Sequence, residues 1–212
     1  GARIIPSFTR NWLARENPGR LPAPFGRFDA ATIVLSALAL GVWTFLPARP
    51  ETGMLLAAAG LVNLARLARW AGDRTLRDPL VLLLHVAYAF VPAGFLVSGL
   101  GALFPDAVPA AAGIHVFSVG AIGSMTLAVM TRASLGHTGR PLRADLATCL
   151  IYATIVLAGP MRLAAAFLPD VPALLHMAAG LWTAAFLGYA VRYGGVLARP
   201  RLGARQPGRA PA

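Results

Sequence analysis

The sequence predicts an all-α fold, a polytopic membrane bundle of six transmembrane helices paired as three hairpins. The chain of 212 residues is 57% hydrophobic and only 13% charged, with a mean hydropathy of +0.65, whereas soluble domains carry about 25% charged residues. Six stretches are apolar and long enough to cross, as helices, a hydrocarbon core of about 30 Å. All nineteen basic residues are arginine, and connections rich in arginine alternate with connections poor in it. A soluble helical bundle is disfavoured because its helices are rarely so long and so evenly apolar.

A basic segment, residues 1–28, precedes the first span and is expected on the cytoplasmic side. The six spans of the transmembrane domain, residues 29–192, are 29–46, 52–70, 79–104, 109–131, 144–168 and 171–192. Asp29, Asp78 and Asp145 begin the first, third and fifth spans, where a carboxylate caps free N–H groups and meets the positive end of the helix. Residues 193–212 form a basic tail without an apolar pattern, and we expect this tail to be disordered.

A weak internal repeat supports the arrangement in hairpins. The stretch LFPDAVPAAAGIH (103–115) resembles FLPDVPALLH (167–176), and FLPARPETGMLL (45–56) repeats the turn without the histidine. Each stretch is a turn followed by a span, which indicates three helical hairpins of about sixty residues.

The arginines predict the orientation of the spans. Seventeen of the nineteen lie in the N-terminal segment, around the second-to-third and fourth-to-fifth connections, or after the sixth span, and only Arg49 and Arg162 lie on the other side. The positive-inside rule places the arginine-rich side, and with it both termini, in the cytoplasm. Topology thus explains the net charge of +11; membrane lipid is the expected partner, and nucleic acid is not expected.

Three of the four histidines lie five or six residues inside predicted spans: His85, His115 and His176. Ionisable side chains at membrane depth are costly, and each is a candidate for function. Imidazole ligates metals and haem, so we expect these histidines to bind haem or copper. Met161 lies near the depth of His176, and a thioether with an imidazole would suit Cu(I). The alternatives are that the histidines only form hydrogen bonds between helices, and that the methionine only fills space.

The fourth histidine lies in the stretch MTRASLGHTGRPLR (130–143), the expected turn between the fourth and fifth spans. Its glycines permit a tight turn, and its arginines contribute to the orientation. His137 lies outside the apolar run, so ligation deep in the bilayer is not expected of it. It could instead contact a haem at the membrane surface, with Arg132 and Arg140 as partners of the propionates.

Several classes of chemistry lack the residues that they need. The sequence has no Walker loop, no GxSxG, no HExxH and no pair of close carboxylates, so hydrolysis and phosphoryl transfer are not expected. The single Cys149 excludes a disulfide or a CxxC metal site within this chain.

The stretch IHVFSVGAIGSMTLAVMTRASLGHTGRPL (114–142) closely resembles the signature of the NnrS family. Members of this family are membrane proteins that contain haem and copper and are linked to nitric oxide and nitrosative stress. Three further stretches resemble the family in the expected order: RIIPSFTRN (3–11), RDPLVLLLHVAYAF (77–90) and WTAAFLGYAVRYGGVLARPR (182–201). The resemblance thus extends over nearly the whole chain.

The resemblance implies haem and copper as cofactors, nitric oxide as a ligand and the bacterial inner membrane as the location. His85, His115 and His137 match positions of the family, whereas His176 is a candidate from its depth alone. Family members are about twice as long, with twelve spans and a His-Glu motif near their start. We therefore expect this chain to be the C-terminal half of such a protein, with the N-terminal half as its partner.

The expected function is protection against nitric oxide and nitrosative stress by a haem- and copper-binding membrane protein, and whether it is an enzyme stays undecided. Two alternatives are open. Repeated hairpins and histidines inside spans also suit a transporter for a small solute or a metal. The third interpretation is a structural or assembly subunit of a membrane complex, in which the histidines only connect helices.

Overall fold

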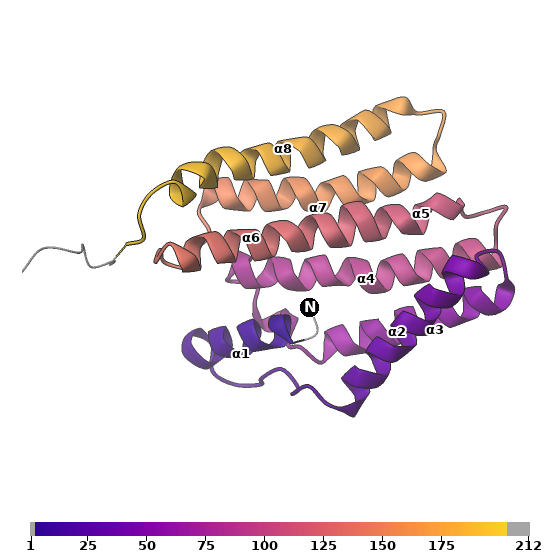
Figure 1. Ribbon diagram of the computed structural model, residues 1–212, viewed down its shortest axis with the longest axis horizontal. Coiled ribbons are helices and arrows are strands. Elements are labelled where there is room, and N and C mark those ends of the chain that lie inside the picture. The colour runs from indigo at the N-terminus through magenta and orange to yellow at the C-terminus, as the bar shows by residue number, and fades with distance from the viewer. Residues whose placement is uncertain (1–2, 203–212) are drawn as a thin grey trace, which may run out of the picture.

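A computed structural model of the chain describes residues 3–202, and regular structure within these residues is entirely helical (Figure 1). The elements are α1 (Ile4–Glu16), α2 (Arg27–Phe45), α3 (Pro50–Ala68), the 3-10 helix η1 (Gly72–Arg74), α4 (Pro79–Leu103), α5 (Ala110–His115), the π-helix η2 (Val116–Gly123), α6 (Ser124–His137), α7 (Leu146–Phe167) and α8 (Pro172–Leu197). Because α5, η2 and α6 follow one another without a break, they form one continuous helix from Ala110 to His137.

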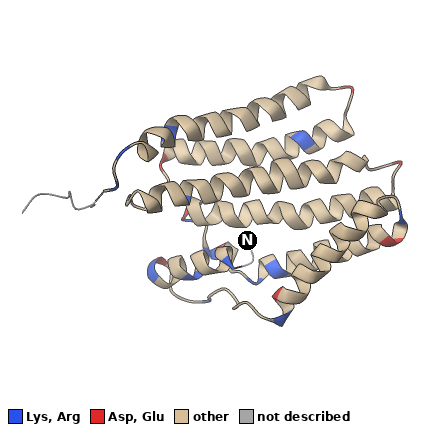
Figure 2. Ribbon diagram, viewed as in Figure 1, with Lys and Arg blue, Asp and Glu red and all other residues tan. Residues whose placement is uncertain are grey.

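The long helices run antiparallel, with α4, the continuous helix α5–η2–α6, α7 and α8 side by side in chain order (Figure 1). The hairpin of α2 and α3 flanks α4 on the other side, and α1 lies beside the N-terminal half of α4. We call the end that carries the connections 69–78 and 138–145 the basic end, and the end that carries the turns 46–49, 104–109 and 168–171 the far end. Most charged residues lie near one of these two ends (Figure 2).

Within residues 3–202, five helices are long and apolar enough to cross a membrane: α2, α4, the continuous helix 110–137, α7 and α8. The prediction of an all-helical membrane bundle is therefore confirmed, although by these criteria the structure has five spans and not six. The predicted second span corresponds to α3, which has 19 residues and is not among the five. The buried polar side chains of Asn63 and Arg66 in α3 lower its apolarity.

The predicted boundaries agree with the structure to within a few residues, except at two C-terminal ends. The helix of the fourth span continues six residues past its predicted end, through His137, and α8 extends to Leu197, inside the predicted tail. The last ten residues of that tail, 203–212, lie outside the described part of the chain. The structure therefore does not test the prediction that these ten residues are disordered.

Two of the three predicted aspartate caps form. The side chain of Asp78 accepts hydrogen bonds from the backbone N–H groups of Leu80 and Val81, and Asp145 accepts one from Thr148. Asp29 is instead the third residue of α2, and its carboxylate accepts a hydrogen bond from the N–H of Gly26, one turn before it. These bonds satisfy donors that have no partner inside the helix.

The N-terminal segment contains a helix that the sequence did not predict. In α1, Ile5, Thr9 and Leu13 recur every four residues and are fully buried, because this spacing places them on one face of a helix. The face is buried where α1 packs against α4. Residues 3–16 thus belong to the basic end of the bundle and cover part of it.

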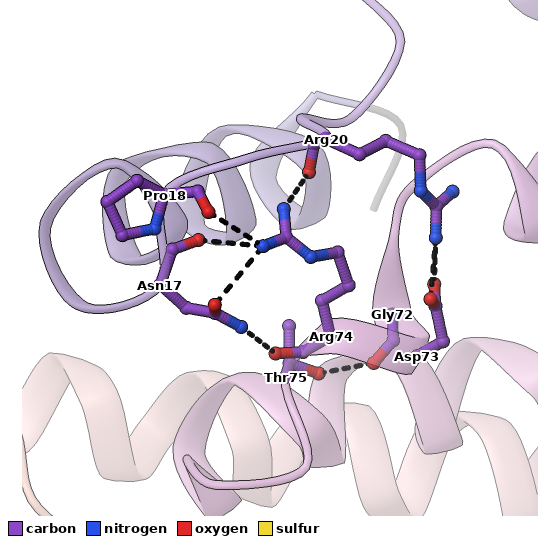
Figure 3. A network of polar contacts seen from close by, with 7 residues as sticks. All are labelled: Asn17, Pro18, Arg20, Gly72, Asp73, Arg74 and Thr75. Carbon is purple, nitrogen blue, oxygen red and sulfur yellow. Dashed lines mark hydrogen bonds and ion pairs between the residues drawn. The ribbon is translucent and has the colours of Figure 1, made fainter.

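The loop after α1 is held by the guanidinium of Arg74 (Figure 3). Arg74 donates hydrogen bonds to the backbone carbonyls of Asn17, Pro18 and Arg20 and to the side-chain oxygen of Asn17. Gly19 has φ +142°, and a Cβ there would lie 2.7 Å from Arg74 Nη2, so a side chain is strained at this position. The adjacent ion pair of Arg20 with Asp73 lowers the pKa of the Asp73 carboxyl.

The main core lies in the basic half of the bundle. Its buried residues come from α1, α4, α6, α7, α8 and the connection after α3, and they include all four tyrosines of the chain: Tyr88, Tyr152, Tyr189 and Tyr193. A smaller cluster between α2, α3 and α4 consists of Ala39, Leu56, Ala59 and Phe95. The larger of these two buried clusters therefore lies at the basic end, whereas the two cavities described below lie at and toward the far end.

Candidate functional site

A cavity of about 300 Å³ lies at the far end of the bundle between α5, α7 and α8. His115 and Arg162 are the ionisable residues of its wall. The other lining residues are alanine, proline, valine and leucine: Pro109, Ala111, Ala165, Ala166, Pro169, Val171, Pro172 and Leu175. The cavity thus combines an apolar wall with one imidazole and one guanidinium, as is typical of sites for cofactors.

A second cavity of about 280 Å³ adjoins the first, since Arg162 and Leu175 line both. Its remaining lining residues are Val119, Ala178, Ala179, Trp182 and Thr183. The lining residues on α8 extend from Pro172 to Thr183, which is about 16 Å of helix at 1.5 Å per residue. The two cavities therefore adjoin each other along α8, with Arg162 and Leu175 in the wall of both.

Close packing of α4 against α5 and η2 fixes the position of His115. Gly113 leaves no room for a side chain, because a Cβ there would overlap the hydroxyl of Ser98. Likewise, a Cβ at Gly94 would lie 2.7 Å from the ring of Phe117. His115 and Ala111, one turn apart, belong to the wall of the cavity.

The helix changes its winding directly after His115. Residues Val116–Gly123 form a π-helix of eight residues, whereas most π-helical segments are single-turn bulges and are frequent at functional sites.

His115 and Arg162 are both half-buried. Each lies five residues from the far-end terminus of its helix, or about 8 Å along the axis at 1.5 Å per residue. The two side chains therefore share one depth.

His85 is in a different environment, at the basic end. It is 5% exposed, and its Nε2 lies 2.8 Å from the hydroxyl of Thr9. Because Thr9 donates its hydroxyl proton to the carbonyl of Ile5, it accepts from His85, which assigns the ring proton to Nε2. Nδ1 has no partner and faces Gly72, where a Cβ would lie 2.6 Å from it. His85 lines neither cavity.

The other ligands predicted inside the membrane do not reach the cavities. His176 is exposed on α8, next to Leu175, which lines both cavities, but His176 lines neither. Met161 precedes Arg162 and also lines neither. Within residues 3–202, no group of three or more His, Cys, Asp or Glu side chains is placed to hold a metal ion. The structure thus brings His115 together with Arg162, and not with His176 or Met161.

The predicted surface site around the fourth histidine also lies away from His115. His137 is the exposed last residue of α6, and Arg132 lies over the ring of Phe8, 4.3 Å from its centroid. Arg132 follows His115 by seventeen residues of continuous helix, or about 25 Å. Arg140 lies still further along the chain and lines neither cavity. One porphyrin could not contact both His115 and these arginines.

The sequence analysis missed two features that involve arginine. One is Arg162, which it counted only for orientation, although an arginine inside a span on the arginine-poor side was a visible signal. The other is a buried ion pair at the basic end, in which Arg66 Nε lies 2.8 Å from Asp29 Oδ1, both side chains being 3–4% exposed. Arg66 also donates to Tyr88, whose hydroxyl donates to Asn63. Opposite charges at the same depth of neighbouring spans would have indicated this pair.

Comparisons with known proteins give one match. The family described as NnrS protein matches over residues 1–201, nearly the whole chain. No curated protein and no solved structure matches it.

Proposed function

The chain belongs to the NnrS family, and we propose that it is a haem-binding membrane protein of the response to nitric oxide and nitrosative stress. Membership of the family and the five apolar helices support the membrane location. The observation that carries the proposal is the cavity at the far end, where His115 and Arg162 stand in an otherwise apolar wall. We propose that the imidazole of His115 would hold the haem iron.

The residues of the two cavities fit a haem by their chemistry. A neutral imidazole is a common axial ligand of haem iron, and His115 is the histidine that lines a cavity. The alanine, valine and leucine side chains suit the apolar faces of a porphyrin, and the second cavity lengthens the site along α8. When bound, the haem would supply an iron that binds nitric oxide, and apolar surroundings would favour the entry of this gas from the bilayer.

Copper finds less support in the described residues. They contain no group of three or more His, Cys, Asp or Glu side chains placed for a metal ion, and His176 and Met161 line neither cavity. Cu(I) would need donors such as these two brought close together. We therefore assign no copper site within residues 3–202 and derive no step from copper.

We further propose that the basic end faces the cytoplasm of a bacterial cell and the far end faces outward across the inner membrane. The positive-inside rule supports this orientation, because the arginine-rich connections all lie at the basic end. The cavity with His115 would then lie in the outer half of the membrane. We also propose that the partner of this chain is the N-terminal half of an NnrS family protein.

The experiment is an absorbance titration of the purified chain with haem in detergent. We expect a Soret band typical of histidine ligation in the wild type and in His85→Ala, and its loss or shift in His115→Ala. His176→Ala serves as the matched control, because this histidine lies at a similar depth but outside both cavities. A His115→Ala variant with an unchanged band and unchanged haem content would contradict the assignment of the ligand.

A further inference from the structure

Unlike Arg66 and Arg192 in the other long helices, Arg162 has no partner of opposite charge within residues 3–202. The ion pairs of residues 3–202 join Arg20 to Asp73, Arg66 to Asp29 and Arg192 to Asp145. Arg162 takes part in none of them. All eight acidic residues of the chain lie within the described part, so every acidic side chain is included in this comparison.

Three other arginines of the long helices each contact a partner within the protein. Arg66 is held by Asp29 and Tyr88, Arg132 lies over the ring of Phe8, and Arg192 binds Asp145 with two nitrogens. A charged side chain at membrane depth is costly and is normally paired or faces a polar cavity. Arg162 is half-buried about 8 Å from the end of its helix and has none of these contacts within residues 3–202, so its guanidinium is available to an anionic ligand.

The position of Arg162 indicates what that partner belongs to. Arg162 lines both cavities, and it shares the first cavity with His115. A guanidinium presents its N–H donors in a planar fork that matches a carboxylate with two parallel hydrogen bonds. A ligand with an apolar body could pack against the aliphatic side chains of the cavity. A metal in it could bind the imidazole of His115, and a carboxylate could accept hydrogen bonds from Arg162.

We infer that Arg162 binds a carboxylate of the porphyrin held by His115, and that it selects porphyrins that carry a free carboxylate. This inference rests on the proposed function. Arg162 would then orient the porphyrin by its carboxylate, while the alanine, valine and leucine side chains of the wall would meet its apolar parts. The guanidinium of Arg162 would thus pair with a carboxylate of the ligand and not with a carboxylate of the protein.

The test compares haem with its dimethyl ester, which has the same iron and the same ring but no free carboxylate. We expect the wild type to bind haem roughly ten- to hundredfold more tightly than the ester, the range for a hydrogen-bonded charge. In Arg162→Gln this preference should disappear, because haem binding falls to the level of the ester and ester binding is unchanged. Arg162→Lys should keep part of the preference, since a lysine keeps the charge but not the fork. The readouts are dissociation constants from the Soret titration and the spectrum of the iron.

Arg49→Gln is the matched control, because Arg49 is the other arginine on the far side, is exposed, and lines neither cavity. It should keep the full preference for haem over the ester. A preference that persists in Arg162→Gln, or that is absent in the wild type, would overturn the inference while leaving the haem proposal intact. If neither porphyrin gives a histidine-ligated spectrum, the proposed function and the inference both fail.

A lipid phosphate is the competing anion. The titration is therefore repeated in a maltoside detergent, which carries no phosphate, with and without added phosphatidylglycerol. If Arg162 binds the porphyrin carboxylate, the preference for haem over the ester should be the same in both. A preference that is lost when phosphatidylglycerol is added would assign Arg162 to the lipid phosphate and overturn the inference.

Discussion

His85 and His115 each lie five or six residues inside a long helix, but at opposite ends of the bundle and in opposite environments. At the basic end, His85 is 5% exposed, hydrogen-bonded to Thr9 and packed against Gly72. At the far end, His115 is half-buried and lines a cavity of about 300 Å³ with Arg162. The same residue type at the same kind of position thus connects elements at one end and is available to a ligand at the other.

The difference teaches that burial alone does not identify a functional histidine. His85 is the more deeply buried, yet its Nε2 already has a partner and the backbone of Gly72 faces its Nδ1. At the basic end, Arg66 is also paired with Asp29, and Arg74 is hydrogen-bonded to the loop after α1. The far end leaves a charge and an imidazole beside a cavity. Four predictions test this contrast between a closed end and an open end.

The largest effect is expected at the buried ion pair. Asp29→Asn would leave the guanidinium of Arg66 buried without its counter-ion, and we expect a loss of about 3–5 kcal/mol in the free energy of unfolding. The measurement is denaturant unfolding in detergent, followed by circular dichroism. Arg162→Gln also removes a charge inside a span, but it should change stability by only about 0.5 kcal/mol or less. Equal losses in the two variants would remove the contrast between the ends.

A double variant checks the cause of that loss. Asp29→Asn combined with Arg66→Gln removes both charges, and it should unfold less easily than Asp29→Asn alone, because no buried charge is then unpaired. If the two losses simply add, the ion pair is not the source of the stability.

The next effect concerns the packing around His85. A Cβ at Gly72 would lie 2.6 Å from Nδ1 and 2.8 Å from Cγ of the histidine ring, so Gly72→Ala should cost about 2–3 kcal/mol through overpacking. Gly180→Ala on α8 is the control, since a Cβ there meets no atom within 4 Å and alanine favours the helix. The thermal unfolding temperature should therefore fall in Gly72→Ala and should not fall in Gly180→Ala. A neutral Gly72→Ala would show that the basic end is looser than the structure indicates.

A smaller effect is expected at the hydrogen bond between Thr9 and His85. Thr9→Val keeps the shape of the side chain but removes the acceptor for His85 Nε2–H, which should cost on the order of 1–2 kcal/mol. Thr44→Val is the control, because Thr44 makes the same bond to the carbonyl four residues before it but is exposed. Hydrogen exchange of the backbone of α1 should increase in the first variant only. An unchanged α1 would mean that His85 does not hold this helix.

The smallest effect is the pH dependence at the basic end. Hydrogen bonds from Thr148, followed by those from Arg192, lower the pKa of Asp145 to about 2. Because the pKa is lower in the folded than in the unfolded chain, where it is about 4, the carboxylate stabilises the fold above pH 4. This contribution is lost as the pH falls from about 4 to about 2. It should be modest, since the side chains of Asp145 and Arg192 are 45% and 39% exposed.

Asp145→Asn removes this titration. The unfolding temperature of the variant should lie below that of the wild type at pH 6, and the two should converge as the pH falls below 4. Curves that stay parallel across this range would show that the carboxylate does not stabilise the fold through its charge.

Much of the fold could be predicted from the sequence, because the deciding signals are local. Long apolar runs predicted the helices to within a few residues, and Asp78 and Asp145 cap helices as expected. The prediction was less accurate for helices that contain both polar and apolar residues. α3 contains Asn63 and Arg66 and is less apolar than the five candidate spans, and the amphipathic helix α1 was not predicted. The apolar content of a stretch does not show which polar side chains will find hydrogen-bonding partners in the folded protein.

The sequence by itself determined that this is a helical membrane protein with arginine gathered on one side, and it indicated the NnrS family. Only the tertiary structure decided which histidine meets a cavity, because that depends on the rotation of each helix and on its neighbours. Thr9 and His85 are 76 residues apart, and Asp29 and Arg66 are 37 apart. His115 and Arg162 belong to helices that come together only when the bundle closes. The hydropathy of a stretch depends only on its own residues, whereas contacts between residues far apart in the sequence form only when the chain folds.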